Sequence, residues 1–193
     1  MIDFLKFYIN GYLIVDNFFS NDICEELRYK AHNSNTHKKY FDYFAIDYDI
    51  PDTESLSKFS DIIKSKISFL KNRKYLRSWS FIYDSVSRGV LPHMDPSKFN
   101  VNIWITPDKS VEDKTKNGII LYKKKPKKSL CMQKNDDYNR FVAEFLKDSK
   151  YDIIPYKYNR AVIFTGNTFH STNSVHMKNG EENKRINYTF LYE

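Results

Sequence analysis

Two histidines and an aspartate are the residues of this sequence whose types and spacing suggest metal chemistry. His93 and Asp95 flank a methionine in the triplet His-Met-Asp. In an extended chain, residues two apart point to the same side, so an imidazole and a carboxylate can converge on one metal ion. Pro96 favours this geometry because a residue before proline is pushed toward extended conformations. The triplet is therefore a candidate pair of metal ligands.

His170 is the candidate third ligand. It follows the segment NRAVIFTGNTF, in which an apolar strand and a turn would deliver the histidine to the start of a new strand. Two histidines and one carboxylate form the facial arrangement that binds non-heme Fe(II) and leaves coordination positions open. His176 is the rival ligand, but it lies in a polar, loop-like stretch. A purely structural role for His170 is the alternative interpretation.

Arg185 begins the last predicted strand, residues 185–192, whose alternation separates two kinds of side chain. Asn187 and Thr189 share a face with Arg185, whereas the opposite face is wholly apolar. Both faces therefore look covered, and a buried guanidinium needs an anion because leaving it unpaired is very costly. A dicarboxylate cosubstrate would supply one, held by the arginine fork with Asn187 as a supporting donor. An ion pair with a carboxylate of the protein is the alternative.

These residues are set among many short strands with few helices. The strands are predicted at 12–15, 76–83, 99–105, 118–122, 161–164 and 185–192, which are rich in β-branched and aromatic residues. Helical apolar spacing follows Ser20, recurs over 56–70 and returns from about residue 136. The pattern predicts a mainly β, jelly-roll or cupin-like double sheet with flanking helices. An open α+β sheet competes, whereas a parallel α/β fold is disfavoured because strands and helices do not alternate.

The length and composition indicate one domain, residues 1–193. We expect an N-terminal strand with supporting helices in 1–75, then the jelly-roll core in 76–193 with a helical insertion near 136–148. The apolar start of the chain is interrupted by polar residues before it could form a signal peptide or a membrane span. We therefore expect a cytoplasmic protein without a membrane partner.

The positive charge is concentrated in one stretch. The chain has 31 Lys and Arg against 24 Asp and Glu, a net charge of +7. The segment from Lys114 to Lys128 contains seven lysines and no acid, so the rest of the chain is neutral overall. A single lysine-rich loop or edge is typical of a solvated surface, which disfavours a nucleic-acid partner.

Read in order, five segments resemble the 2-oxoglutarate and Fe(II)-dependent oxygenases. They are HMD at 93–95, NVNIWITPDKS at 100–110, NGIILY at 117–122, NRAVIFTGNTFH at 159–170 and KRINYTFLY at 184–192. The opening GYLIVDNFFSNDICEELR is similar to the N-terminal segment of the phytanoyl-hydroxylase-like and prolyl-hydroxylase-like branches. The resemblance covers nearly the whole chain, and it implies a double-stranded β-helix.

The resemblance also implies roles for single residues. Fe(II) would be bound by His93, Asp95 and His170, and Arg185 would pair with the far carboxylate of 2-oxoglutarate. Asn187 and Asn102 are further candidates for binding the cosubstrate. Asn117 stands where relatives often carry the first of two glycines.

The activity implied is a dioxygenase that uses O2 and couples oxidative decarboxylation of 2-oxoglutarate, to succinate and CO2, with substrate oxidation. Asp95 favours hydroxylation over halogenation, because halogenating relatives leave that ligand position open for halide. The substrate would be a small molecule or a peptide, and the motifs do not indicate which. They indicate no oligomeric state either.

Two other functions fit parts of the pattern. A zinc-dependent hydrolase could use the same triad with an activated water, although it has no need of the dicarboxylate clamp at Arg185. A noncatalytic jelly-roll module could instead bind sugar or nucleic acid through the Lys114–Lys128 segment, with structural histidines.

Overall fold

The computed structural model describes residues 2–33, 38–41, 44–48, 54–126 and 136–193. Its helices are α1 (Ile2–Asn10), α2 (Asn21–Asn33), α3 (Glu54–Lys66) and α4 (Asp136–Leu146). The strands of the first half are β1 (Tyr12–Val15), β2 (Lys38–Phe41), β3 (Phe44–Tyr48), β4 (Tyr75–Tyr83), β5 (Val86–Ser87) and β6 (Phe99–Trp104). Those of the second half are β7 (Ile119–Tyr122), β8 (Tyr151–Ile154), β9 (Ala161–Thr165), β10 (His170–Thr172), β11 (Val175–His176) and β12 (Arg185–Tyr192).

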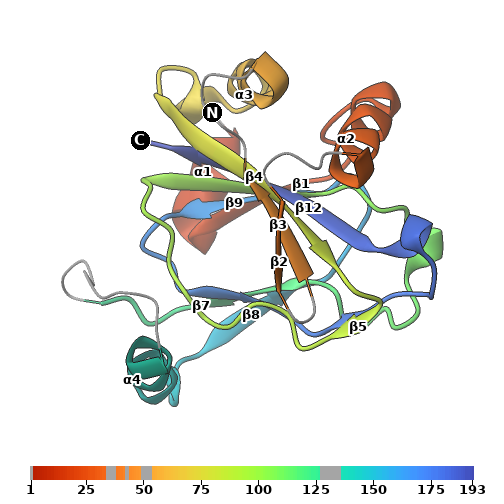
Figure 1. Cartoon of the computed structure of the whole chain (residues 1–193). Helices are drawn as coiled ribbons and strands as arrows, with labels where there is room; N and C mark the ends of the chain where they lie inside the picture. The colour runs from red at the N-terminus through yellow and green to blue at the C-terminus, as the bar shows by residue number, and fades with distance from the viewer. Residues whose placement is uncertain (1, 34–37, 42–43, 49–53, 127–135) are drawn as a thin grey trace.

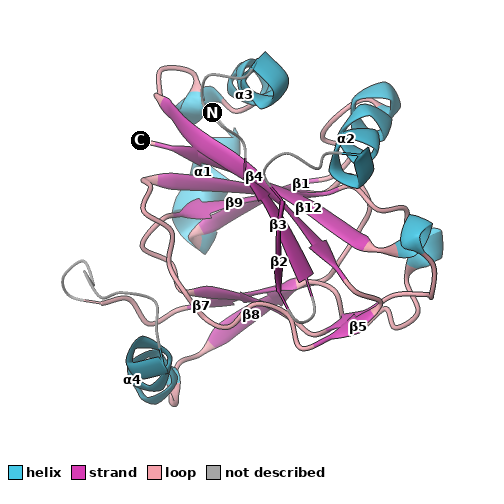
Figure 2. Ribbon diagram, viewed as in Figure 1, coloured by secondary structure: helices cyan, strands magenta, loops and turns pink. Residues whose placement is uncertain are grey.

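The strands form a large sheet that faces smaller ones. The large sheet has the order β1-β9-β6-β12-β4-β3-β2, and the smaller sheets are β10-β7-β8 and β11-β5. Figures 1 and 2 show the large sheet above β7, β8 and β5, with α1, α2 and α3 on its outer side. The described architecture confirms the predicted double sheet with flanking helices.

The alternation of β12 separates two interiors. Ile186, Tyr188 and Phe190 pack with residues of the outer helices in the main hydrophobic core. Arg185 and Asn187 point the other way, toward the smaller sheets, and all eight residues of the strand are buried. The sequence prediction that both faces of this strand are covered is therefore confirmed.

The predicted elements lie where the pattern placed them, and others appear that it did not indicate. The helix expected near 136–148 is α4, inserted between β7 and β8. Helix α1 and the β2–β3 hairpin were not predicted. Phe7 of α1 packs its ring 4.9 Å from that of Phe69 and 5.8 Å from that of Phe99. Such tertiary packing stabilises short helices that sequence periodicity alone does not reveal.

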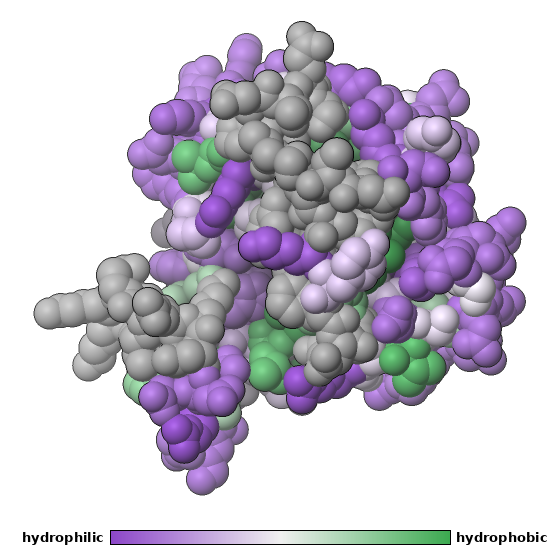
Figure 3. Space-filling model, viewed as in Figure 1, coloured by the Kyte–Doolittle hydropathy of each residue, from purple (hydrophilic) through white to green (hydrophobic). Residues whose placement is uncertain are grey.

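Hydrophilic side chains cover most of the described surface on the face shown in Figure 3. Among the described helices, none combines the length and apolar character that crossing a bilayer requires.

Close backbone contact at Gly166 joins the two loops that carry the candidate metal ligands. The Gly166 amide donates to the Lys98 carbonyl over 3.0 Å, in the segment that follows Asp95. A Cβ atom at Gly166 would stand 1.9 Å from the Ser97 carbonyl oxygen. The turn before His170 therefore has no room for a larger residue.

We predict that Gly166→Ala lowers the free energy of unfolding by about 1–3 kcal/mol, as overpacking does elsewhere. Chemical denaturation would measure the loss. Gly11→Ala is the comparison, because a Cβ there meets no atom within 4 Å and only its positive φ of 79° opposes the change. Equal stability of Gly166→Ala and wild type would refute the tight contact.

Candidate metal centre

The two candidate histidines are held side by side by their own backbones. The His93 amide donates to the His170 carbonyl and the His170 amide to the His93 carbonyl, each over 2.9 Å. The ring centroids lie 4.3 Å apart. Possible ligand atoms of His93, Asp95 and His170 all lie within 4.8 Å of one another. The structure thus brings together the three residues that the sequence singled out.

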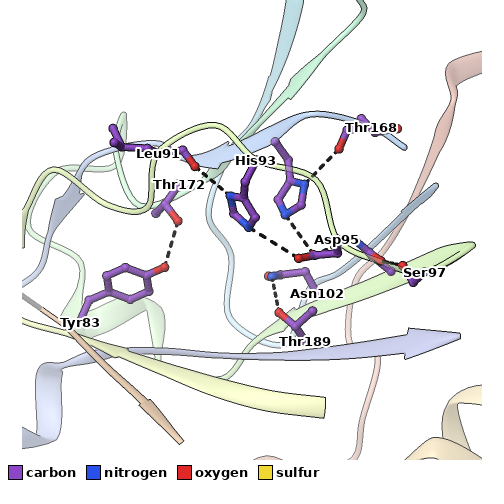
Figure 4. A network of polar contacts seen from close by, with 11 residues as sticks. Tyr83, Leu91, His93, Asp95, Ser97, Asn102, Thr168, Thr172 and Thr189 are labelled. Atoms are coloured by element: carbon purple, nitrogen blue, oxygen red, sulfur yellow. Dashed lines mark hydrogen bonds and ion pairs between the residues drawn. The ribbon is translucent and has the colours of Figure 1, made fainter. Parts of the chain in front are cut away.

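Hydrogen bonds fix which ring nitrogens face the centre of this cluster. Nδ1 of His93 lies 2.8 Å from the Leu91 carbonyl oxygen, and Nδ1 of His170 lies 3.1 Å from that of Thr168 (Figure 4). A carbonyl oxygen only accepts, so each ring carries a proton on Nδ1. Both Nε2 atoms face Asp95, at 3.8 Å and 3.3 Å from its carboxylate oxygens. The two Nε2 atoms and the Asp95 carboxylate thus point toward one another, which is the arrangement in which they could share a metal ion.

The Asp95 carboxylate is oriented by Asn100, which sequence reasoning missed. Nδ2 of Asn100 donates to Oδ2 of Asp95 over 2.9 Å, and the Ser97 hydroxyl donates to Oδ1 of Asn100. Asn100 is fully buried and Asp95 nearly so. Polar Asn100 and Asn102 alternate with apolar residues in the sequence of β6, and this signal could have pointed to an inward polar face.

The inserted helix α4 packs against the segments that carry His93, Asp95 and His170. Its buried residues Tyr138, Val142 and Leu146 pack with Phe169, the neighbour of His170, and with Met94. Burial raises the pKa of the Tyr138 phenol, and a hydrogen bond with the Met94 backbone acts in the opposite direction. The helix therefore contacts the residue between His93 and Asp95 as well as the residue before His170.

Arg185 is a buried cation surrounded by neutral groups. Its side chain is fixed by hydrogen bonds from Nε to the Asn117 carbonyl, 2.8 Å, and from a terminal nitrogen to Oδ1 of Asn187, 2.7 Å. The guanidinium carbon lies 4.8 Å from the ring centroid of Tyr83 and 5.8 Å from those of Trp104 and Tyr156. Burial lowers the pKa of Arg185, which means that its charged form lacks the solvation it has in water.

The ion pairs found among the described residues do not include Arg185. The protein carboxylate considered as an alternative partner is therefore not seen in that part of the chain. Arg185 and the His93–Asp95–His170 cluster instead line one pocket. A cation for which the described residues offer no ion-pair partner thus shares a cavity with three potential metal ligands.

Asn117 adopts a backbone conformation that is otherwise most common for glycine. Its backbone has a φ of 69°, a left-handed conformation that asparagine tolerates better than most residues. Its side chain bonds to the backbones of Asp113 and His176, which holds this conformation. The carbonyl is thereby aimed at Arg185. His176, the rival ligand, lies on β11 and is not part of the cluster.

Asn102 and Asn187 also line the pocket, as the sequence suggested for cosubstrate-binding residues. Oδ1 of Asn187 accepts from Arg185, so Asn187 orients the arginine and only its amide nitrogen is left to donate. Nδ2 of Asn102 donates to the Thr189 hydroxyl over 3.1 Å, and its Oδ1 is buried without a hydrogen-bond partner (Figure 4). Rotating this amide by 180° keeps a bond to Thr189, whose hydroxyl then donates, and places the Nδ2 donor where the unpaired Oδ1 now lies.

The lysine-rich segment is only partly described. Lys123 forms an ion pair with Asp152, and Lys124 lies over the Phe145 ring, 4.6 Å from its centroid. Lys127 and Lys128 lie outside the described residues. The expectation that this segment is a solvated surface rather than a nucleic-acid site stays a prediction.

No family model and no curated protein matches the chain. Its structure is similar to HygX from Streptomyces hygroscopicus with nickel, 2-oxoglutarate and hygromycin B bound, with a TM-score of 0.69, 11% identity and coverage of 99% of this chain and 86% of that one. It is similar to SnoN, a non-heme α-ketoglutarate-dependent epimerase from nogalamycin biosynthesis, with a TM-score of 0.67 and 12% identity. The match covers 97% of this chain and 80% of that one. It is also similar to a prolyl hydroxylase from Trichoplax adhaerens in complex with a fragment of the hypoxia-inducible factor oxygen degradation domain. For this structure the TM-score is 0.61, the identity is 14%, and the match covers 98% of this chain and 86% of that one.

The chain therefore has the double-stranded β-helix fold of the 2-oxoglutarate-dependent non-heme iron enzymes. This confirms the fold that the sequence resemblance implied.

We predict that Asn100→Ala weakens the binding of Fe(II) by about 10–100-fold, the usual effect of removing a group that orients a metal ligand. Anaerobic titration of the metal-free protein would measure this. Asn183→Ala, which removes a side chain from a surface turn, should bind Fe(II) as wild type does. Unchanged affinity in Asn100→Ala would show that Asp95 needs no such support.

Proposed function

We propose that this protein is a non-heme Fe(II) and 2-oxoglutarate-dependent dioxygenase. One observation carries the proposal: a buried arginine for which the described residues provide no carboxylate opens into the same pocket as two imidazoles and a carboxylate. A metal site alone fits several reactions. The combination with a buried cation fits a cosubstrate that chelates a metal at one end and carries an anion at the other.

The donor set fits iron. His93, Asp95 and His170 would hold Fe(II) through two Nε2 atoms and one carboxylate oxygen, leaving positions for the cosubstrate and O2. When bound, the iron supplies the activation of O2 for which side chains have no equivalent. The protein's own residues then have three tasks: they fix the ligands, hold the cosubstrate and limit access of water.

The cosubstrate would be held mainly by Arg185, whose guanidinium can bind its far carboxylate with charge-assisted hydrogen bonds. Tyr83 lies against Arg185 in the pocket, and its hydroxyl lies 3.0 Å from that of Thr172 (Figure 4). One of these two hydroxyls donates to the other, so this pair could give one further hydrogen bond to the same carboxylate. Asn102 in its rotated state would donate nearer the metal, because Asn100, two residues before it on β6, holds Asp95.

Within this class we propose hydroxylation. Asp95 is buried and held by Asn100 in a position to bind the metal, so its ligand place is not left open for a halide. The similar structures include an epimerase, SnoN, and a carbocyclase, SnoK, so the fold is compatible with other oxidative outcomes. A zinc hydrolase would have no use for the buried Arg185. A noncatalytic binding module would have no use for two Nε2 atoms and a carboxylate that point toward one another.

Anaerobic addition of Fe(II) and then 2-oxoglutarate to the metal-free protein should produce the visible charge-transfer band of a chelated 2-oxo acid. The band requires both additions because it arises from the metal and the oxo acid together. His170→Ala should abolish it. Tight zinc binding without a band would favour the hydrolase, and no metal binding would favour a noncatalytic module.

Arg185→Gln should weaken 2-oxoglutarate about 100-fold or more, since it removes charge-assisted hydrogen bonds in a buried site. Iron affinity should change little. Arg185→Lys keeps the charge but loses the two-pronged geometry of the guanidinium, so its affinity for 2-oxoglutarate should lie between those of Arg185→Gln and wild type. Arg140→Gln on the exposed side of α4 is the matched control. Equal losses of iron and 2-oxoglutarate affinity would instead identify Arg185 as a structural residue.

A further inference from the structure

Beside the proposed metal site, β4 presents an aromatic surface with an arginine at its end. Its inward residues pair in register with those of β12, and the four pairs are Tyr83 with Arg185, Phe81 with Asn187, Trp79 with Thr189 and Arg77 with Leu191. Because a strand rises about 3.3 Å per residue, successive pairs are about 6.6 Å apart. The first three rows line the pocket, and the row of Arg77 and Leu191 lies next beyond it.

The metal site can be placed on these rows. Asp95 is bonded to Asn100, and Asn100 lies opposite Leu191 in the pairing of β6 with β12. The triad is thus level with the Leu191 and Thr189 rows, whereas Arg185 begins the strand about 13 Å away from Thr189. A cosubstrate that runs from Arg185 to the metal lies along the Tyr83 and Phe81 rows. Trp79 and Arg77 are level with the metal and lie to its side.

The chemistry of these two residues is specific. Trp79 lines the pocket and is 7% exposed. The guanidinium of Arg77 lies 5.6 Å from the Trp79 ring centroid, and Arg77 is itself exposed to solvent. An indole face stacks on flat rings, and an exposed guanidinium beside it pairs with an anion. Phe44 of β3 extends the aromatic surface, with its ring 5.7 Å from that of Phe81.

We propose that Trp79 and Arg77 form the substrate-binding wall, and that the substrate is a small molecule with a planar ring and an anionic substituent. This inference rests on the proposed function, because it takes the metal as the reacting centre. The ring lies on Trp79 next to the metal, and the anion meets Arg77 at the rim.

The test uses the full chain loaded anaerobically with Fe(II) and 2-oxoglutarate, and 2-naphthalenesulfonate as the probe. This probe has a flat ring and a charge, and sulfonates are poor ligands for iron. 2-Naphthalenemethanol keeps the ring without the charge, and methanesulfonate keeps the charge without the ring. Calorimetry should show saturable binding of 2-naphthalenesulfonate that is tighter than that of either partial probe.

Matched variants locate the binding. Arg77→Gln should weaken 2-naphthalenesulfonate about two- to fivefold, as loss of an exposed ion pair does. Trp79→Leu should weaken it about threefold or more through lost stacking. Arg73→Gln and Phe141→Leu are the controls, because Arg73 stacks on Phe99 outside the pocket and Phe141 lies exposed on α4. Both should bind the probe as wild type does.

The charge-transfer band of the same samples distinguishes a failure of the substrate-binding wall from a failure of the proposed function. If the band forms but the probe does not bind, or binds equally to wild type and Arg77→Gln, the substrate wall is wrong and the proposed function stands. If a peptide-sized ligand alone binds, the small-molecule assignment is wrong. If the band does not form, the proposed function fails, and with it the description of this ligand as a substrate.

Discussion

A positive charge in the interior of a β-sandwich is the constraint on which the site depends. The Arg185 guanidinium is buried among aromatic rings, one backbone carbonyl and one amide oxygen. Neutral groups compensate only part of the cost of burying a guanidinium. An anion bound by Arg185, as the proposed function requires, would recover part of the remainder and would thereby stabilise the folded protein. The left-handed turn at Asn117 and the register of β12 both serve to hold this cation in place.

The site combines residues from different parts of the fold. Arg185 is on the large sheet, His170 is on the small sheet, and His93 and Asp95 lie in a connection between strands. The distance between Arg185 and the candidate metal ligands is set along the strands, because Arg185 begins β12 whereas Asp95 is bonded to Asn100, which pairs with Leu191 near the other end of β12. Helix α4 contacts the loops of the small-sheet side, and it is a structural support for the site although it contributes no candidate ligand.

The placement of residues that follows from local spacing could be predicted. The two-residue spacing of His93 and Asp95 and the alternation of Arg185 with its neighbours depend only on the extended chain. Asn100 and Asn117 could not be assigned, because their roles arise from contacts across turns and between strands. Asn117 meets an arginine 68 residues further along the chain. The β2–β3 hairpin was missed for the same reason: β3 is stabilised by pairing with β4, and such a pairing leaves little trace in a short sequence window.

The reciprocal backbone bonds between His93 and His170 have a consequence for metal selection. They hold the two backbones together while the Nδ1 bonds orient the rings, so a metal ion would meet ligands that are already ordered and would cost little entropy on binding. An ordered set of two imidazoles and one carboxylate also accepts other divalent ions of the first transition series, whose affinities follow a common order. The identity of an ion bound there would then be decided less by the shape of this site than by which metals the surroundings supply.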